Sequence, residues 1–205
     1  MQTPSASPGT GLADLPDEDL MVLVARGIVQ EPATELFARH NRDLFNFLAW
    51  LTGGNLAEAE DLAQKTWLRL ISRCSDYRPG AATFRTWLFQ IARNAFIDAR
   101  RAASERLRSN VDPEAAIERE TTADHSTREA GPDPEASLVA GESRDRLHAA
   151  LLALPVAQRE VVVLRYFGNL SLDEVSATVG AGVETVRSRL RYAYRALRSR
   201  LEGGA

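Results

Sequence analysis

Residues 102–143 divide the apolar residues of the chain into two separate blocks. This stretch has few large apolar side chains and contains three prolines, Pro113, Pro132 and Pro134. Such a segment cannot bury enough apolar surface to offset the conformational entropy that it loses on ordering. We therefore expect residues 102–143 to form a flexible linker, and the rest of the 205-residue chain to fold into two small domains.

The block before the linker has the periodicity of a helical bundle. Between residues 35 and 51, apolar side chains recur every three or four positions, and a Thr-Gly-Gly-Asn run follows. Similar patterns predict further helices, at residues 17–27, 57–73 and 83–101. We expect these helices to form one domain at residues 17–101, after a disordered Pro/Ser/Gly-rich tail at residues 1–16.

The block after the linker contains a helix-turn-helix pattern. Ser171 and Glu174 have the spacing of a capping box, in which each side chain accepts a hydrogen bond from the other residue's backbone N–H. Gly180 then ends this short helix, and a second helix begins at Val183. Strand patterns are nearly absent from the chain. The sequence therefore predicts an all-α fold whose C-terminal domain, at residues 144–201, is a helix-turn-helix.

The charges are distributed unevenly along the chain. Residues 102–143 carry ten acidic and four basic side chains, a local charge of −6, whereas the whole chain carries −3. Residues 183–200 carry six arginines and one glutamate, a local charge of +5. Residues 85–101 carry four arginines and one aspartate, a local charge of +3. Two basic helices separated by an acidic linker favour a protein that binds nucleic acid.

Several classes of function lack their residues in this sequence. No apolar run reaches the roughly 18–20 residues of a membrane span, so we expect no membrane insertion. The single cysteine, Cys74, excludes an internal disulfide, and the three histidines have no metal-binding spacing. No phosphate-binding glycine loop or nucleophile–base pair is present. We therefore expect a cytoplasmic protein that is not an enzyme, with no catalytic residue, no cofactor and no metal site.

Three stretches resemble the extracytoplasmic-function (ECF) RNA polymerase sigma factors, a group of the sigma-70 family. They are AEAEDLAQKTWLRL at residues 57–70, TFRTWLFQIARNAFIDARR at 83–101 and LPVAQREVVVLRYFGNLSLDEVSATVGAGVETVRSRLRYAYRALR at 154–198. A regulator that shares only the helix-turn-helix would lack the first two stretches. The resemblance implies that the chain binds core RNA polymerase and directs initiation at specific promoters, in response to an envelope or environmental stress. Anti-sigma factors are common further partners in this family.

The resemblance implies that the domain at residues 144–201 is sigma region 4, which reads the promoter −35 element. In a helix-turn-helix the second helix enters the major groove, where arginine binds guanine edges bidentately. The face of this helix that the pattern leaves exposed supplies the candidate contacts: Thr185, Arg187, Ser188, Arg189, Arg191, Tyr192 and Arg195. The structural alternative is an arginine-rich helix face that is only solvated.

The resemblance likewise implies that residues 17–101 are sigma region 2, which binds core polymerase and recognises and melts the −10 element. An exposed ring beside arginines can stack on unpaired bases, and Asn can pair with a base edge. The candidate −10 contacts are Asp76, Tyr77, Arg78, Arg93, Asn94, Arg100 and Arg101. Tyr77 has the alternative role of anchoring its loop, and we expect Trp87 to pack in the core rather than stack on a base.

The resemblance also places the helix at residues 57–73 against a coiled coil of a large polymerase subunit. The candidate contacts with core polymerase lie near one polar edge of this helix: Asp61, Gln64 and Lys65. A merely solvated edge is the alternative for each of them. Two rival functions stay open for the whole chain. One is a helix-turn-helix regulator that does not act as a sigma subunit, and the other is a decoy that binds polymerase without opening DNA.

Overall fold

The computed structural model describes residues 11–109 and 145–202, and within these ranges it contains helices and no strand. The predicted all-α fold is confirmed. Residues 1–10, 110–144 and 203–205 lie outside the described residues, and so does most of the expected linker.

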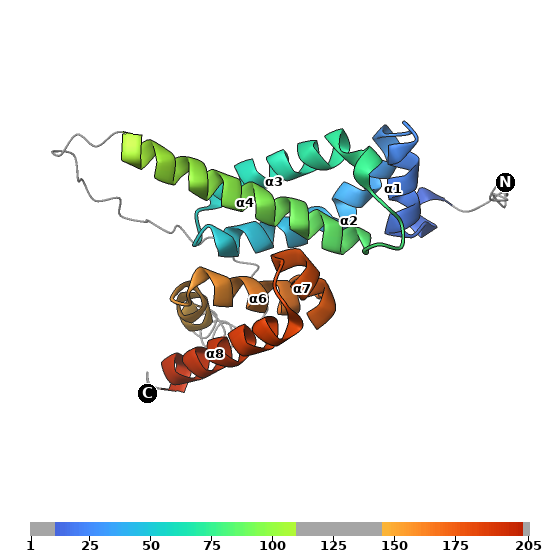
Figure 1. Ribbon diagram of the computed structural model, residues 1–205. Coiled ribbons are helices and arrows are strands. Elements are labelled where there is room, and N and C mark those ends of the chain that lie inside the picture. The colour runs from blue at the N-terminus through green and yellow to red at the C-terminus, as the bar shows by residue number, and fades with distance from the viewer. Residues whose placement is uncertain (1–10, 110–144, 203–205) are drawn as a thin grey trace, which may run out of the picture.

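Helix α2 (Gln30–Leu51) lies at the centre of the N-terminal domain (Figure 1). Three helices pack against it, namely α1 (Asp17–Ala25), α3 (Leu56–Ser72) and α4 (Phe84–Ser109). The inward side chains of α2 follow the helical period that the sequence predicts, and all are buried: Leu36, His40, Leu44, Phe47, Leu48 and Leu51. The predicted four-helix bundle is therefore present, because one stripe of α2 fills the space between its neighbours.

The ends of the N-terminal domain extend further than the sequence pattern predicts. Helix α2 begins at Gln30 rather than at residue 35. Helix α4 continues to Ser109, so residues 102–109 are helical and their assignment to the linker is wrong. Ala, Glu, Leu and Arg supply most of residues 102–109, and all four are good helix formers. The sequence pattern misses this extension because these residues face solvent and add no apolar stripe.

Residues 11–16 pack on α2 instead of belonging to a disordered tail. They include a 3-10 helix, η1 (Leu12–Asp14). The guanidinium of Arg39, on α2, donates to three backbone carbonyls there: Leu12 at 3.3 Å, Ala13 at 2.7 Å and Leu15 at 2.8 Å. The same side chain pairs with Asp17 at 2.8 Å, at the start of α1. The expected disorder of residues 1–16 is therefore wrong for this part.

The C-terminal domain comprises a helix at residues 145–152, then α6 (Val156–Tyr166), α7 (Leu172–Val179) and α8 (Val183–Glu202). Both hydrogen bonds of the predicted capping box are present: Glu174 N–H donates to Ser171 Oγ at 3.2 Å, and Ser171 N–H donates to the Glu174 carboxylate at 2.9 Å. Gly180 ends α7 with φ +64°, a left-handed conformation that glycine adopts without strain. The predicted helix-turn-helix is confirmed.

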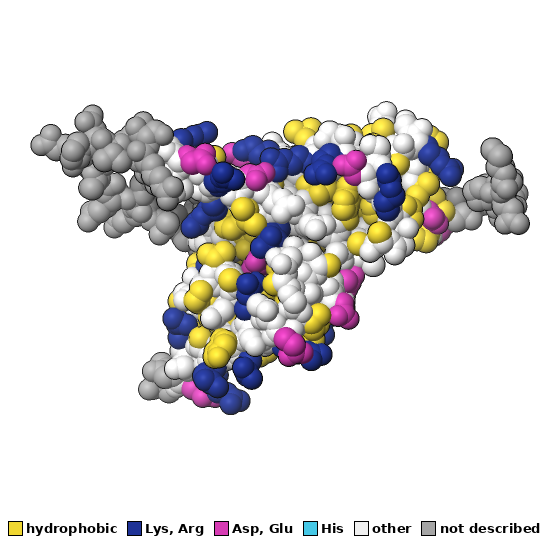
Figure 2. All heavy atoms as spheres, in the orientation of Figure 1, with side chains coloured by type: hydrophobic (Ala, Val, Ile, Leu, Met, Phe, Trp, Pro, Cys, Tyr) yellow, Lys and Arg dark blue, Asp and Glu magenta, His cyan; other side chains and the backbone are white. Residues whose placement is uncertain are grey.

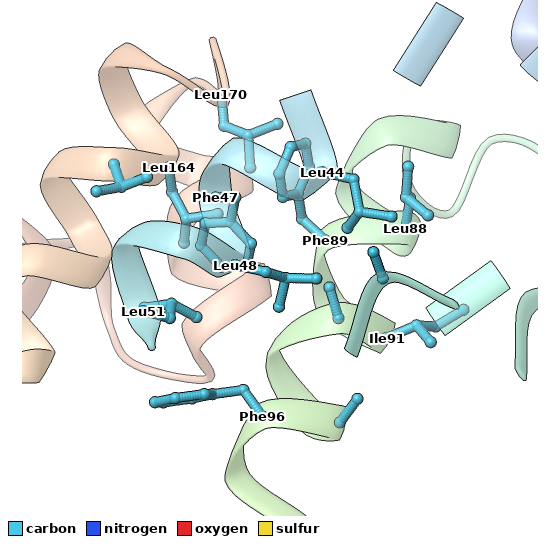
Figure 3. Packing of buried hydrophobic residues seen from close by; sticks show 14 of the residues in the cluster. Leu44, Phe47, Leu48, Leu51, Leu88, Phe89, Ile91, Phe96, Leu164 and Leu170 are labelled. Atoms are coloured by element: carbon cyan, nitrogen blue, oxygen red, sulfur yellow. The ribbon is translucent and has the colours of Figure 1, made fainter. Parts of the chain in front are cut away.

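The two domains share one hydrophobic core, which the sequence pattern does not reveal. The C-terminal domain lies along α2 and α4, with α6 against α2 and α7 against α4 (Figure 1). Leu164 and Leu170 of the C-terminal domain point toward Phe47 of α2 (Figure 3), and none of the three is more than 1% exposed. The link between the domains is therefore a packed interface as well as a covalent one.

Gly168 gives a test of the packing at this interface. A Cβ added there would lie 2.5 Å from the carbonyl oxygen of Leu164, a backbone atom that cannot swing away. We expect Gly168→Ala to lower the free energy of unfolding by about 1–3 kcal/mol, the usual cost of overpacking, measured by urea unfolding of the full chain. Gly11→Ala is the control, because its added Cβ meets its nearest listed neighbour at an ordinary 3.8 Å. Equal stability of the two variants would contradict the packing described.

Candidate nucleic-acid and polymerase interfaces

Helix α8 presents a basic face at the start of the second helix of the helix-turn-helix. Val186, Leu190 and Ala193 are buried and fix the orientation of the helix. The opposite face leaves five of the candidate −35 residues exposed: Thr185, Arg187, Arg191, Tyr192 and Arg195. Arg191 and Arg195 lie over the Tyr192 ring, 5.5 and 6.0 Å from its centroid. The ring thus groups two guanidinium ions on the surface through cation–π contacts.

Two other candidate −35 residues are only half exposed. Ser188 and Arg189 are of intermediate burial. Arg189 lies close enough to the carboxylate of Glu160, on α6, to lower the pKa of that group. Arg187, in contrast, pairs with Glu184 at 2.7 Å on the open surface. An exposed pair of this kind contributes little to stability, so Arg187 stays available to an outside anion.

The loop that carries the first −10 candidates differs from expectation at Tyr77. The ring is 5% exposed and lies against Trp87 with centroids 5.2 Å apart. Helix α1 contacts the 3-10 helix η2 (Cys74–Asp76) just before it. Burial raises the pKa of Tyr77 to about 12, and the nearby charges of Glu18 and Asp17 act in the same direction. The expectation of an exposed ring is wrong in this structure, because α1 closes over a position that looks like open loop in the sequence.

The flanking loop residues remain on the surface. Asp76 pairs with Arg73 at 2.9 Å, and Arg78 donates to the backbone carbonyl of Ser75 at 2.6 Å. Both side chains of the candidate set are exposed. Trp87 is half-buried and packs against the core, which agrees with the packing role that the sequence predicts for it.

The remaining −10 candidates form two adjoining stripes of α4. Arg93 and Arg100 are seven positions apart, as are Asn94 and Arg101, so each pair lies on one side of the helix. Asn94, Arg100 and Arg101 are exposed. Arg93 is half-buried and pairs with Glu160 of the C-terminal domain at 2.6 Å. The structure thus leaves three of these four side chains open to a ligand and engages the fourth. Figure 2 shows basic side chains gathered over α4 and around the C-terminal end of α8.

The polymerase candidates on α3 border an apolar groove. Asp61, Gln64 and Lys65 are all exposed. Beside Gln64 lies a groove of about 450 Å³, whose lining consists of Phe37, Asn41, Phe45, Glu60, Ala63, Gln64, Trp67 and Leu68. Trp67 Nε1 donates to Asn41 Oδ1 at 3.0 Å and stays fixed on the groove wall.

The groove contains functional candidates that the sequence pattern does not single out. Phe37 is 46% exposed and Leu68 is 68% exposed, which is unusual for large apolar side chains. Both lie outside the core stripes of α2 and α3, and this off-stripe position was the available signal. Exposed apolar side chains around fixed polar groups are typical of a protein-binding surface rather than of a solvated edge.

The described residues show no feature that points to catalysis by a bound metal. No group of three or more His, Cys, Asp or Glu side chains within residues 11–109 and 145–202 is placed to hold a metal ion. No described helix is long and apolar enough to cross a membrane.

Two family models match the chain. The model described as Sigma-70 region 2 matches residues 36–106, and the model described as Sigma-70, region 4 matches residues 150–199. Among curated relatives, the ECF RNA polymerase sigma factor SigE of Mycolicibacterium smegmatis is 35% identical over 83% of this chain, which spans 62% of the length of SigE. SigL of Mycobacterium tuberculosis is 34% identical over 82% of this chain and 87% of its own length.

Solved structures share the fold of both domains. The structure of CnrH in complex with the cytosolic domain of CnrY matches 92% of this chain and 99% of its own, with a TM-score of 0.65 and 24% identity. The sigma factor RpoE of Bartonella quintana, solved with the anti-sigma factor NepR, matches 84% of this chain and 98% of its own, with a TM-score of 0.67 and 22% identity.

The buried Tyr77 ring gives a test by paired substitutions. Its hydroxyl is buried without a hydrogen-bond partner, so Tyr77→Phe removes an unpaired polar group and should leave the free energy of unfolding unchanged or raise it. Tyr77→Ala removes a packed ring and should lower the free energy of unfolding by about 3–5 kcal/mol. Urea unfolding of both variants measures the difference. A small and equal effect of the two changes would show that the ring is exposed in solution.

Proposed function

The chain belongs to the ECF RNA polymerase sigma factors of the sigma-70 family, and we propose how its two domains divide the work at a promoter. The domain at residues 17–101, extended by α4 to Ser109, binds core polymerase and recognises and melts the −10 element. The domain at residues 144–201 reads the −35 element. The observation that carries this division is that one chain has two basic helices, α4 and α8, in two separate domains.

Helix α8 reads duplex DNA in this proposal. Its N-terminal half is exposed on one side and anchored by Val186 and Leu190 on the other, as a helix in the major groove must be. Arg187 and Arg191 lie one turn apart on the exposed side, where each can bind a guanine edge. Thr185, Ser188, Tyr192 and Arg195 flank them and suit phosphate contacts.

Helix α4 acts on separated strands in this proposal. Asn94 can donate to and accept from an unpaired base, while Arg100 and Arg101 follow the phosphates. Asp76 and Arg78 border this track from the preceding loop. Tyr77 contributes stacking only after its ring has left the contact with Trp87, so we assign it a role that depends on movement of α1.

The groove between α2 and α3 binds core polymerase in this proposal. Its apolar lining, with Leu68 the most exposed, supplies the area that a partner helix would bury. Asp61, Gln64 and Lys65 form a polar rim that fixes the orientation of the partner. Because the groove faces away from the buried stripe of α2, binding there leaves the core undisturbed.

The proposal extends to regulation and location. CnrH and the Bartonella quintana RpoE were both solved with partner proteins, and NepR is described as an anti-sigma factor. We propose that this chain also has an anti-sigma partner, that release from it follows an envelope or environmental stress, and that the chain works in the cytoplasm, where polymerase is. Polymerase performs the chemistry, and the chain needs neither a catalytic residue nor a cofactor of its own.

Transcription with purified core polymerase tests the function. The wild-type chain should yield new, promoter-specific transcripts from a genomic DNA library, whereas a helix-turn-helix regulator or a non-melting decoy would yield none. Leu68→Asp should abolish these transcripts by placing a charge in the groove. Leu56→Asp is the matched control, since Leu56 is exposed on the same helix but does not line the groove, and it should transcribe normally. Equal activity of the two variants would contradict the role of the groove.

Helix α8 can be tested on the promoters identified in this way. Arg191→Ala should weaken binding to a cognate upstream duplex by about 1–3 kcal/mol while changing random duplex affinity much less, at one fixed salt concentration. Arg198→Ala is the control, because Arg198 is exposed at the far end of α8, where it pairs with Glu202 at 3.3 Å. An equal loss on both duplexes would make Arg191 a phosphate contact rather than a base contact.

A further inference from the structure

Polar contacts tie the two domains together around their shared apolar core. Arg85, on α4, donates to the backbone carbonyl of Gly168 at 2.5 Å. The carboxylate of Glu174 accepts from the hydroxyls of Thr83 at 2.8 Å and Thr86 at 3.0 Å. Burial acts to raise the pKa of Glu174, but these bonds and those from Ser171 outweigh it and lower the pKa. The charged form of Glu174 is therefore well solvated by the interface itself.

Glu160 lies at the centre of this interface. Its side chain is 7% exposed and pairs with Arg93 at 2.6 Å. Arg189, on α8, is close enough to act electrostatically on the same carboxylate. Burial raises the pKa of Glu160 above its ordinary value, and the two arginines offset part of this effect. One buried carboxylate thus engages a cation from each domain.

The two cations come from the two surfaces assigned to DNA. Arg93 belongs to the −10 set on α4, and Arg189 belongs to the −35 set on α8. A carboxylate with two guanidinium neighbours has the charge and the acceptor oxygens that a DNA phosphate would offer. Figure 2 shows basic and acidic side chains side by side where the two domains meet.

An apolar contact supports the ionic one. Trp50, near the end of α2, lies against His148 and Phe167 of the C-terminal domain, with ring centroids 4.7 and 5.5 Å apart. Arg159 of α6 donates to the backbone carbonyl of Leu51 at 3.3 Å in the same region. Separation of the domains would expose these rings together with Leu164 and Leu170, so the closed arrangement opposes its own opening.

We propose that Glu160 acts as an internal substitute for a DNA phosphate, and that its contact with Arg93 and Arg189 holds the free chain in a closed, autoinhibited form. The proposal rests on the DNA-binding roles proposed above. In the closed form, one cation of each DNA surface is engaged and the two domains cannot separate along a promoter. Opening the clamp releases both cations for phosphates.

The test measures DNA binding by the free, full-length chain. Glu160→Ala and Trp50→Ala weaken the interface from opposite domains, and each should bind a fluorescent random-sequence duplex several-fold more tightly than wild type. If two arginines are released, the slope of log K against log salt should steepen by about 1.8, at about 0.9 per phosphate contacted. Glu31→Ala is the matched control, because Glu31 is exposed at the start of α2 and its removal changes the net charge equally. Unchanged affinity and slope in both clamp variants, or the same gain in Glu31→Ala, would overturn the proposal.

A reversible cross-link tests the opposite direction. In a Cys74→Ser background, Thr83→Cys and Glu174→Cys place thiols on either side of the interface, and a short bifunctional methanethiosulfonate reagent joins them. The cross-linked chain should lose promoter-dependent transcription with core polymerase, and reductant should restore it. Transcription that survives complete cross-linking would overturn the clamp. Tighter duplex binding by Glu160→Ala and Trp50→Ala, together with no transcripts from the wild-type chain, would instead refute the proposed function and leave the clamp standing.

Discussion

The burial of α2 on several sides is the constraint on which the rest of the structure depends. Helices α1, α3 and α4 of its own domain pack against it, and so does α6 of the other domain. Leu44, Phe47, Leu48 and Leu51 are fully buried as a result. At about 1.5–3 kcal/mol for each large apolar side chain removed from water, this stripe is comparable to the net stability of a small domain. Both functional surfaces of the N-terminal domain are built on helices that α2 positions.

The interface between the domains combines apolar and charged contacts, which gives it a character different from the core of either domain. A buried ion pair contributes little net stability, because desolvation of both ions offsets their attraction. It does make the contact specific, since Arg93 and Glu160 are satisfied together in one arrangement. The same carboxylate can be replaced by another anion of similar shape, whereas a purely apolar contact offers no such exchange. A sigma factor whose domains must separate along a promoter benefits from an interface that an anion can open.

The sequence predicts most of the helices, and the reasons for its failures are physical. The stripe on α2 and the capping box at Ser171 and Glu174 are local patterns, so both are visible in the sequence and both are confirmed. The burial of Tyr77 depends on α1, which is distant along the chain, and no local pattern encodes that contact. Arg93 and Glu160 look like solvated charges in the sequence, because their partners lie in opposite domains.

The candidate sites show the same limit. The exposed arginines of α8 follow from the helical period, but the half-buried position of Arg189 depends on how the domains pack. The groove beside α3 was detectable in part, since Phe37 and Leu68 fall outside the core stripes. The role of residues 110–143 as a linker stays a prediction, because they lie outside the described residues.

The distance between the domains, before and after polymerase binds, tests most directly whether this is a sigma factor that opens to act. Dyes at Ala25→Cys in α1 and Ala177→Cys in α7, in a Cys74→Ser background, report that distance by single-molecule energy transfer, since both positions are exposed. We expect one high-transfer population for the free chain and a shift to low transfer when core polymerase and promoter DNA are added. An identical distribution in the two conditions would contradict the account.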